Sequence, residues 1–194
     1  MRVLVVWAHP LEGSFSAVLC KTAVEALTAA GHQVDVWDLY REGFNPVLGP
    51  QERRLYHDKA RNHQHLIDDI ARVQAAEGLV FVFPTWNFGF PAVLKGWFDR
   101  TLIPGVAFHM EPTGLKPGLT HVRKLAAVTT FGAKDWMVRF VIGHPVKKLM
   151  ARGLMRLCAP GTRCDWLALY NMNANGVADR QAHVAKVQKV LGAW

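Results

Sequence analysis

Apolar residues fall into segments of two kinds that alternate along the chain. Residues 3–8 and 79–83 are continuous apolar runs of strand length, a pattern typical of strands buried on both faces. Residues 125–130 and 164–169 are interpreted as two more strands, the first of them buried. Residues 34–39 alternate apolar and polar side chains, which predicts a more exposed strand.

Apolar residues at helical spacing separate these strands. The first helix lies between a cap at Ser14 or Ser16 and Gly31, and another starts after Pro91, which suits a first helical turn. Residues 41–62 form a polar excursion, partly helical after Pro50, and residues 103–118 are expected to form an irregular loop. The other helical ranges are 66–73, 92–102, segments of 138–157 and a closing helix over 182–194.

This alternation predicts an α/β fold with a five-stranded, doubly wound parallel sheet and helices on both faces. The 194 residues show no repeat and no linker, so residues 1–194 are expected to form a single domain. Ligands of such sheets bind outside the carboxyl ends of the strands, near the switch in strand order. We therefore expect the chemistry just after the first, third and fourth strands.

Composition narrows the class of protein. The apolar start is too short for a secretory signal, and no run could span a bilayer, which predicts a cytoplasmic protein without membrane insertion. Cys20, Cys158 and Cys164 form no pattern for disulfides or metal, and His63 and His65 lack further ligands, so no metal site is expected. The net charge is +8, with the densest basic run over 134–163. No nucleic-acid motif accompanies the charge, so nucleic acid is not an expected partner.

Three loops carry the candidate chemistry. The first holds His9, Ser14 and Ser16 at a helix amino terminus, which favours an anion such as a phosphate; helix capping by Ser14 is the competing interpretation. The absence of GxGxxG and of a Walker lysine argues against a dinucleotide fingerprint and a P-loop. The second, residues 83–91, sets aromatic side chains in a Gly/Pro-rich turn suited to a flat heterocycle. The third, residues 129–133, supplies hydroxyls and a glycine.

These loops resemble those of the flavodoxin-like NAD(P)H:quinone oxidoreductases. The matching residues are Ala8-His9-Pro10 and Ser14-Phe15-Ser16, then residues 83–99 with the run Pro-Ala-x-Leu-Lys-Gly-Trp-Phe-Asp, then Thr129-Thr130-x-Gly132. The resemblance runs from residue 1 to about 133. The long run is highly specific, whereas the Thr pair is not.

The resemblance implies a flavin, FAD or FMN, with NAD(P)H as electron donor and a quinone-like acceptor. His9, Ser14, Phe15 and Ser16 would hold the phosphate region. The isoalloxazine would contact two further sets: Pro84, Thr85, Trp86, Asn87 and Phe88, and Thr129, Thr130, Phe131 and Gly132. The helix over 95–99 would help form a homodimer.

The chain departs from the family after residue 133. Well-studied members place a Tyr and a His there, but residues 134–144 contain no Tyr, and His144 matches only with a shift. His144 is therefore a catalytic candidate whose competing interpretation is structural.

The sequence thus predicts hydride transfer from NAD(P)H to a small acceptor by a ping-pong mechanism. Two alternatives remain: a regulatory subunit of a membrane transport system, and a flavodoxin-type electron carrier, which the basic charge disfavours.

Overall fold

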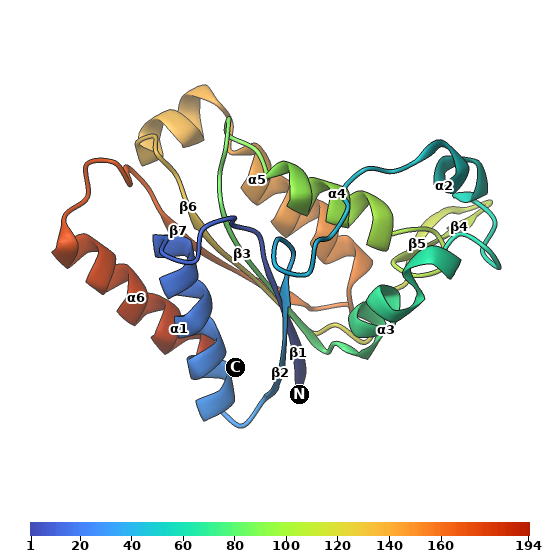
Figure 1. Cartoon of the computed structure of the whole chain (residues 1–194), viewed down its shortest axis with the longest axis horizontal. Coiled ribbons are helices and arrows are strands. Elements are labelled where there is room, and N and C mark those ends of the chain that lie inside the picture. The colour runs from blue at the N-terminus through green and yellow to red at the C-terminus, as the bar shows by residue number, and fades with distance from the viewer.

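Five parallel strands form the central sheet in the computed structural model, which describes residues 1–194 (Figure 1). They are β1 (Arg2–Trp7), β2 (Gln33–Asp38), β3 (Gly78–Pro84), β6 (Lys124–Thr130) and β7 (Arg163–Leu169), in the order β2-β1-β3-β6-β7. The prediction of a five-stranded parallel sheet is confirmed. The switch in strand order lies between β1 and β3, where ligands of doubly wound sheets bind.

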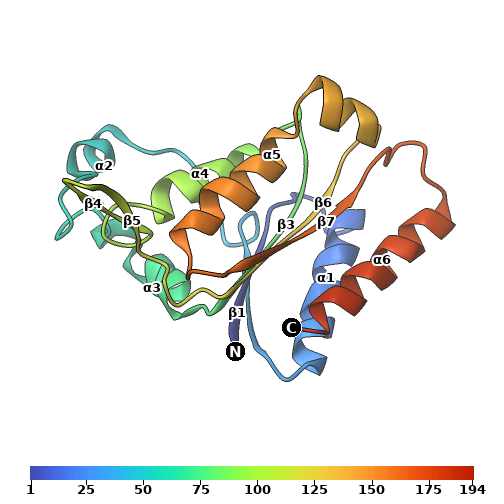
Figure 2. The ribbon, with the colours of Figure 1, turned by 180° about the vertical axis from the view of Figure 1, so that it is seen from behind.

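Helices cover both faces of the sheet, as predicted (Figures 1 and 2). Helices α1 (Phe15–Ala29) and α6 (Val177–Leu191) lie side by side on one face. The other face carries α3 (Ile67–Ala75), α4 (Ala92–Thr101) and α5 (Pro145–Lys148). None of these helices combines the length and apolar character needed to cross a bilayer.

Two boundaries differ from the sequence prediction. Residues 103–118 are not wholly irregular, because β4 (Phe108–Glu111) and β5 (Gly114–Pro117) pair as an antiparallel hairpin. Helix α6 begins five residues before the predicted start at Ala182, since the Asp179 carboxylate accepts a hydrogen bond from the Gly176 N–H and caps the earlier turn. The hairpin lies beside the excursion that holds α2 (Pro50–Leu55) (Figure 1).

Large aromatic side chains fill the core between the sheet and α4. Trp97 of α4 is fully buried, and its ring centroid lies 5.6 Å from that of Trp37 and 5.5 Å from that of Phe81. In both pairs the rings meet edge to face, an arrangement that adds to the stabilisation from buried area alone. This packing fixes α4, and with it the loop that precedes α4 at the end of β3.

The excursion after β2 is held against α4 at Gly96 and Arg100. A Cβ on Gly96 would lie 2.2 Å from the Pro46 carbonyl oxygen, so only glycine fits beneath this segment. Nearby, the buried Arg100 guanidinium donates to the Glu52 carboxylate and to the Asn45 carbonyl. The close backbone approach explains why the specific run at the start of α4 contains a glycine within a helix.

We expect Gly96→Ala to lower the free energy of unfolding by about 3 kcal/mol, because the added methyl overlaps backbone atoms that cannot move independently. Gly153→Ala is the matched control, since its Cβ meets nothing within 4 Å. Denaturant unfolding of both variants measures the difference. Equal stability of the two variants would show that the contact with Pro46 is not tight.

Candidate functional site

Loops from the ends of four strands meet at the carboxyl edge of the sheet, hereafter the rim. The His9 and Trp86 ring centroids are 6.2 Å apart, which joins the loops after β1 and β3. Thr85 donates to the Thr130 carbonyl from its N–H at 2.8 Å and from its hydroxyl at 2.9 Å. The structure therefore brings together the three segments that the sequence singled out.

The first loop keeps hydrogen-bond donors available. Ser14 caps α1 by accepting from the Ala17 N–H, and Ser16 accepts from the Trp7 indole at 3.1 Å. Both hydroxyls use an oxygen lone pair in these bonds, so each retains a proton to donate. The His9 Nδ1 atom lies 3.0 Å from the Leu11 N–H and 3.2 Å from the Leu11 carbonyl oxygen, so the ring is held by the backbone of its own loop. Together with the amino terminus of α1, this loop suits an anionic group.

The second loop is a tight turn with two residues in the left-handed region. Trp86 and Gly89 exchange backbone hydrogen bonds at 3.2 and 2.9 Å, and Asn87 and Phe88 between them have φ of 49° and 60°. Positive φ at both central residues defines a type I′ turn, which is unfavourable for a residue as bulky as Phe. No protein acceptor takes the Asn87 or Phe88 N–H. The turn therefore presents two unpaired donors beside the half-exposed Trp86 ring.

In the third loop, main-chain atoms are more available to a ligand than side chains are. The Thr129 and Phe131 side chains are fully buried, so any contact from these residues would come from the main chain. Gly132 follows with an N–H that no protein group accepts. Pro84, at the end of β3, is buried as well. The binding roles of these residues remain predictions.

The loop after β7 completes the rim, and the sequence prediction did not include it. Asn171 donates its N–H to the Ala133 carbonyl at 2.9 Å, and Met172 donates to the Phe131 carbonyl at 2.9 Å. The Tyr170 ring stacks on Phe131 at 5.0 Å. The switch-point rule applies to every strand end, so the turn-rich stretch after residue 169 was the signal that could have revealed this loop.

Tyr170 supplies His144 with the hydroxyl partner that is absent from residues 134–144. The two side chains lie 2.7 Å apart, from Nε2 to the phenolic oxygen, and that oxygen also accepts from the Trp166 indole at 3.1 Å. Burial, reinforced by Lys147 and Arg139, lowers the pKa of His144, which keeps the ring neutral at pH 7. His144 thus belongs to a buried network behind the third loop.

A further cation lies beside the first loop. The Arg180 guanidinium carbon is 5.9 Å from the Phe15 ring centroid, and its buried Nε has no hydrogen-bond partner. From this point a groove of about 520 Å³ runs between α1 and α6. Its lining includes Phe15, Val18, Arg180, Gln181, Val184 and Ala185.

The comparisons with known proteins agree with this architecture. The model of the family described as flavodoxin-like fold matches residues 1–191. The chain belongs to this flavodoxin-like family. Rat NAD(P)H dehydrogenase [quinone] 1 is 32% identical over 148 residues, which are 68% of this chain and 54% of the rat protein. The chain therefore spans about half the length of the mammalian quinone dehydrogenases that it matches.

Two solved structures support the same fold for this flavodoxin-like protein. Smu.1420 from Streptococcus mutans has a TM-score of 0.86 at 27% identity, with both chains fully covered. A Bacillus anthracis FMN-dependent NADH-azoreductase, solved in complex with FMN, has a TM-score of 0.77 at 18% identity, covering 99% of this chain and 98% of that one.

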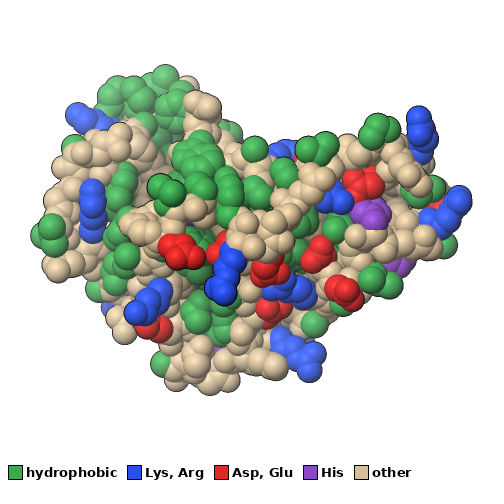
Figure 3. Space-filling view, viewed as in Figure 1, with side chains coloured by type: hydrophobic (Ala, Val, Ile, Leu, Met, Phe, Trp, Pro, Cys, Tyr) green, Lys and Arg blue, Asp and Glu red, His purple; other side chains and the backbone are tan.

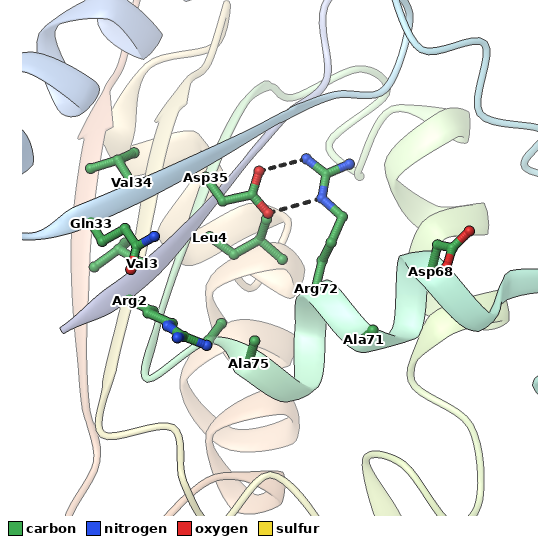
Figure 4. Close-up of a pocket in the computed structure, with 11 residues that line it drawn as sticks. Arg2, Val3, Leu4, Gln33, Val34, Asp35, Asp68, Ala71, Arg72 and Ala75 are labelled. Atoms are coloured by element: carbon green, nitrogen blue, oxygen red, sulfur yellow. Dashed lines mark hydrogen bonds and ion pairs between the residues drawn. The ribbon is translucent and has the colours of Figure 1, made fainter.

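The opposite edge of the flavodoxin-like sheet is also hollowed, but the charged groups at its centre pair with one another. A groove of about 520 Å³ lies between β1, β2 and α3, and Figure 4 shows the residues that line it. There the Arg72 guanidinium binds both oxygens of Asp35 at 2.9 Å, and it also reaches Glu42 at 2.8 Å. No group of three potential metal ligands occurs anywhere in the structure. The rim, with its unpaired donors, is therefore the candidate site.

We expect Tyr170→Phe to cost the flavodoxin-like protein about 1–2 kcal/mol of unfolding free energy at pH 7, because it leaves the Trp166 indole and the His144 ring unpaired.

The pKa of His144 is lowered in the folded state. The contribution of this side chain to stability is therefore present above its ordinary pKa of 6.5 and is lost as pH falls. The stability advantage of the wild type over His144→Asn should accordingly shrink between pH 7 and pH 5. Denaturant unfolding at each pH measures both effects, and an advantage that does not change with pH would contradict a neutral His144.

Proposed function

We propose that this chain is a flavin-dependent oxidoreductase that takes hydride from NAD(P)H and reduces a quinone or a similar small acceptor. The observation that carries the proposal is the convergence at one rim of an anion-binding helix terminus and an aromatic turn with unpaired N–H groups. The name of the rat relative and the FMN-bound azoreductase neighbour support the same chemistry.

Each rim loop would hold a different part of the flavin. The hydroxyls of Ser14 and Ser16, with the amino terminus of α1, would bind phosphate. The N–H groups of Asn87 and Phe88 would donate to the polar edge of the ring system, and Trp86 would cover part of its face. When bound, the flavin supplies the hydride chemistry, while the protein supplies orientation and electrostatics.

The unpaired donors have a role beyond binding. Backbone N–H groups fixed by the turn at Asn87 and Phe88, and by the loop at Gly132, can stabilise negative charge on the ring without reorganisation. None of these N–H groups has a backbone acceptor within the protein. Donor and acceptor substrates would occupy the same slot in turn, which is the basis of the proposed ping-pong order.

A homodimer is part of the proposal. Between α4 and the helical turns after α5 lies an almost wholly apolar groove, which suits a second copy of the chain better than it suits water. Its lining includes Phe90, Phe98, Leu102, Leu149 and Leu154.

We expect the purified protein incubated with flavin to show bound-flavin absorption that bleaches on anaerobic addition of NADH or NADPH and returns when a quinone is added. Steady-state double-reciprocal plots at several quinone concentrations should be parallel.

Trp86→Ala should weaken flavin binding about tenfold, because the isoalloxazine ring loses an aromatic contact worth about 1 kcal/mol or more. Leu115→Ala, exposed on the β5 hairpin, is the control. Failure to take up any flavin would refute the proposed function.

The groove between α1 and α6 favours FAD over FMN. It starts at Phe15 and Arg180, beside the phosphate loop, and its apolar lining with two glutamines suits an adenosine moiety. The unpartnered Arg180 Nε offers a donor for a second phosphate.

We therefore expect FAD to bind at least about tenfold more tightly than FMN, the equivalent of about 1.4 kcal/mol. Ala185→Trp would fill the groove and should weaken FAD binding while leaving FMN binding unchanged. Ala182→Trp, exposed on α6 outside the groove, is the matched control. Equal affinities for FAD and FMN, unaffected by Ala185→Trp, would contradict the FAD assignment without affecting the flavin proposal.

A further inference from the structure

A single helical turn projects beyond the rim with its apolar side chains in water. This turn, residues 136–142, is hereafter called the apolar knob, and it follows the third rim loop. Figure 3 shows hydrophobic side chains gathered at the upper left, where Figure 1 places this turn. Phe140 is 83% exposed and Val141 65% exposed, and Trp136 is 55% exposed. Exposed apolar patches of this kind mark surfaces that another phase or molecule covers.

The apolar knob is attached to the rest of the protein through one buried side chain, and its backbone is fixed by hydrogen bonds. Only Val138 points inward, and it is fully buried. The backbone of the turn is closed by hydrogen bonds from the Val138 N–H to the Lys134 carbonyl and from the Ile142 N–H to the Met137 carbonyl. The turn is thus anchored through one side chain, while the remaining apolar side chains are displayed outward from a fixed backbone.

Cations flank the knob in the sequence, and one of them lies against its end. The Lys148 Nζ lies 3.4 Å from the position that a Cβ on Gly143 would take, so this ammonium group sits against the end of the turn. Lys134, Lys147 and Lys148 form no ion pair, and the lone carboxylate of the segment, Asp135, pairs with Arg139 at 2.7 Å. Residues 134–156 carry six Lys or Arg side chains against this one acidic residue. The knob therefore combines aromatic and aliphatic side chains with an unneutralised positive charge.

We propose that the apolar knob and its flanking lysines dock the protein on an anionic lipid surface. Trp and Phe side chains partition into the interface between headgroups and acyl chains, and each nearby Lys or Arg adds about 1 kcal/mol of attraction to anionic lipid. No helix crosses the bilayer, so the contact is peripheral.

Charge selects the bilayer over a second copy of the chain. In a two-fold interface centred on the knob, the knob would meet its own copy, and the unpaired lysines would face one another. An anionic membrane neutralises these lysines instead, in a protein whose net charge is already +8. The proposed dimer groove between α4 and the turns after α5 is lined by other residues and adjoins this surface at Leu149, next to Lys148.

Docking would set the rim close to the bilayer, because the knob follows directly after the third loop and Gly132. An apolar quinone dissolved in the membrane could then enter the site from the lipid side. This consequence rests on the proposed function, whereas the docking itself does not depend on flavin or on activity.

The test is co-sedimentation of the full-length protein, as purified, with phosphatidylcholine vesicles that contain or lack about one-quarter phosphatidylglycerol, at about 100 mM salt. The protein should sediment with the anionic vesicles only. Binding should fall about tenfold or more in Phe140→Ser/Val141→Ser, and also in Lys147→Glu/Lys148→Glu. Both residues of the first pair are exposed, so the fold should persist, which circular dichroism would verify.

Matched controls keep the change in hydrophobicity or charge but move it elsewhere. Val47→Ser/Leu115→Ser removes two other exposed apolar side chains, and Arg41→Glu/Arg54→Glu makes the same charge change. Both variants should bind as the wild type does. Absence of wild-type binding to anionic vesicles would overturn the proposal. Full binding by both Phe140→Ser/Val141→Ser and Lys147→Glu/Lys148→Glu would do the same. So would sedimentation velocity showing that Phe140→Ser/Val141→Ser dissociates a dimer, since the knob would then be covered by a second copy.

Discussion

The burial of β3 and β6 on both faces is the constraint from which the rest of the structure follows. Side chains of β3 that point one way join the core beneath α1 and α6, and those that point the other way join the core beneath α4. Each face needs its own helical layer, and parallel strands need a crossover between every pair. All carboxyl ends then fall on one edge, so His9, Thr85, Thr130 and Tyr170 meet although they are far apart in the sequence.

Backbone strain is concentrated at the same edge. Four non-glycine residues have positive φ, and every one lies in a rim loop or at its support: Asn87, Phe88, His144 and Asn171. Left-handed backbone at such residues costs free energy and persists only where the surroundings determine it, which is common at functional sites. Here the supports are visible. The exchange of hydrogen bonds between Trp86 and Gly89 closes one turn, and the Tyr170 hydroxyl holds the His144 ring.

The sequence predicted what depends on local pattern and on the order of elements. Strand-length apolar runs gave the sheet, and the residues after β1, β3 and β6 gave three of the four rim loops. The β4–β5 hairpin was missed because its strands are four residues long, exposed and without strong alternation. The pairing of His144 with Tyr170 was missed because 26 residues separate them and only the adjacency of β6 and β7 brings them together.

The two ends of the sheet differ in the kind of polar group that each presents: paired charged side chains at the amino end and free backbone N–H groups at the carboxyl end. At the amino end, Arg72 satisfies Asp35 and Glu42, and the Arg2 N–H is taken by Glu77. The charged groups at the centre of that hollow are therefore already paired within the protein. At the carboxyl end, the N–H groups of the second and third loops and the buried Nε of Arg180 are unpaired. Buried or fixed donors without acceptors are costly in a folded protein, so a ligand bound at the rim would supply acceptors that these donors lack.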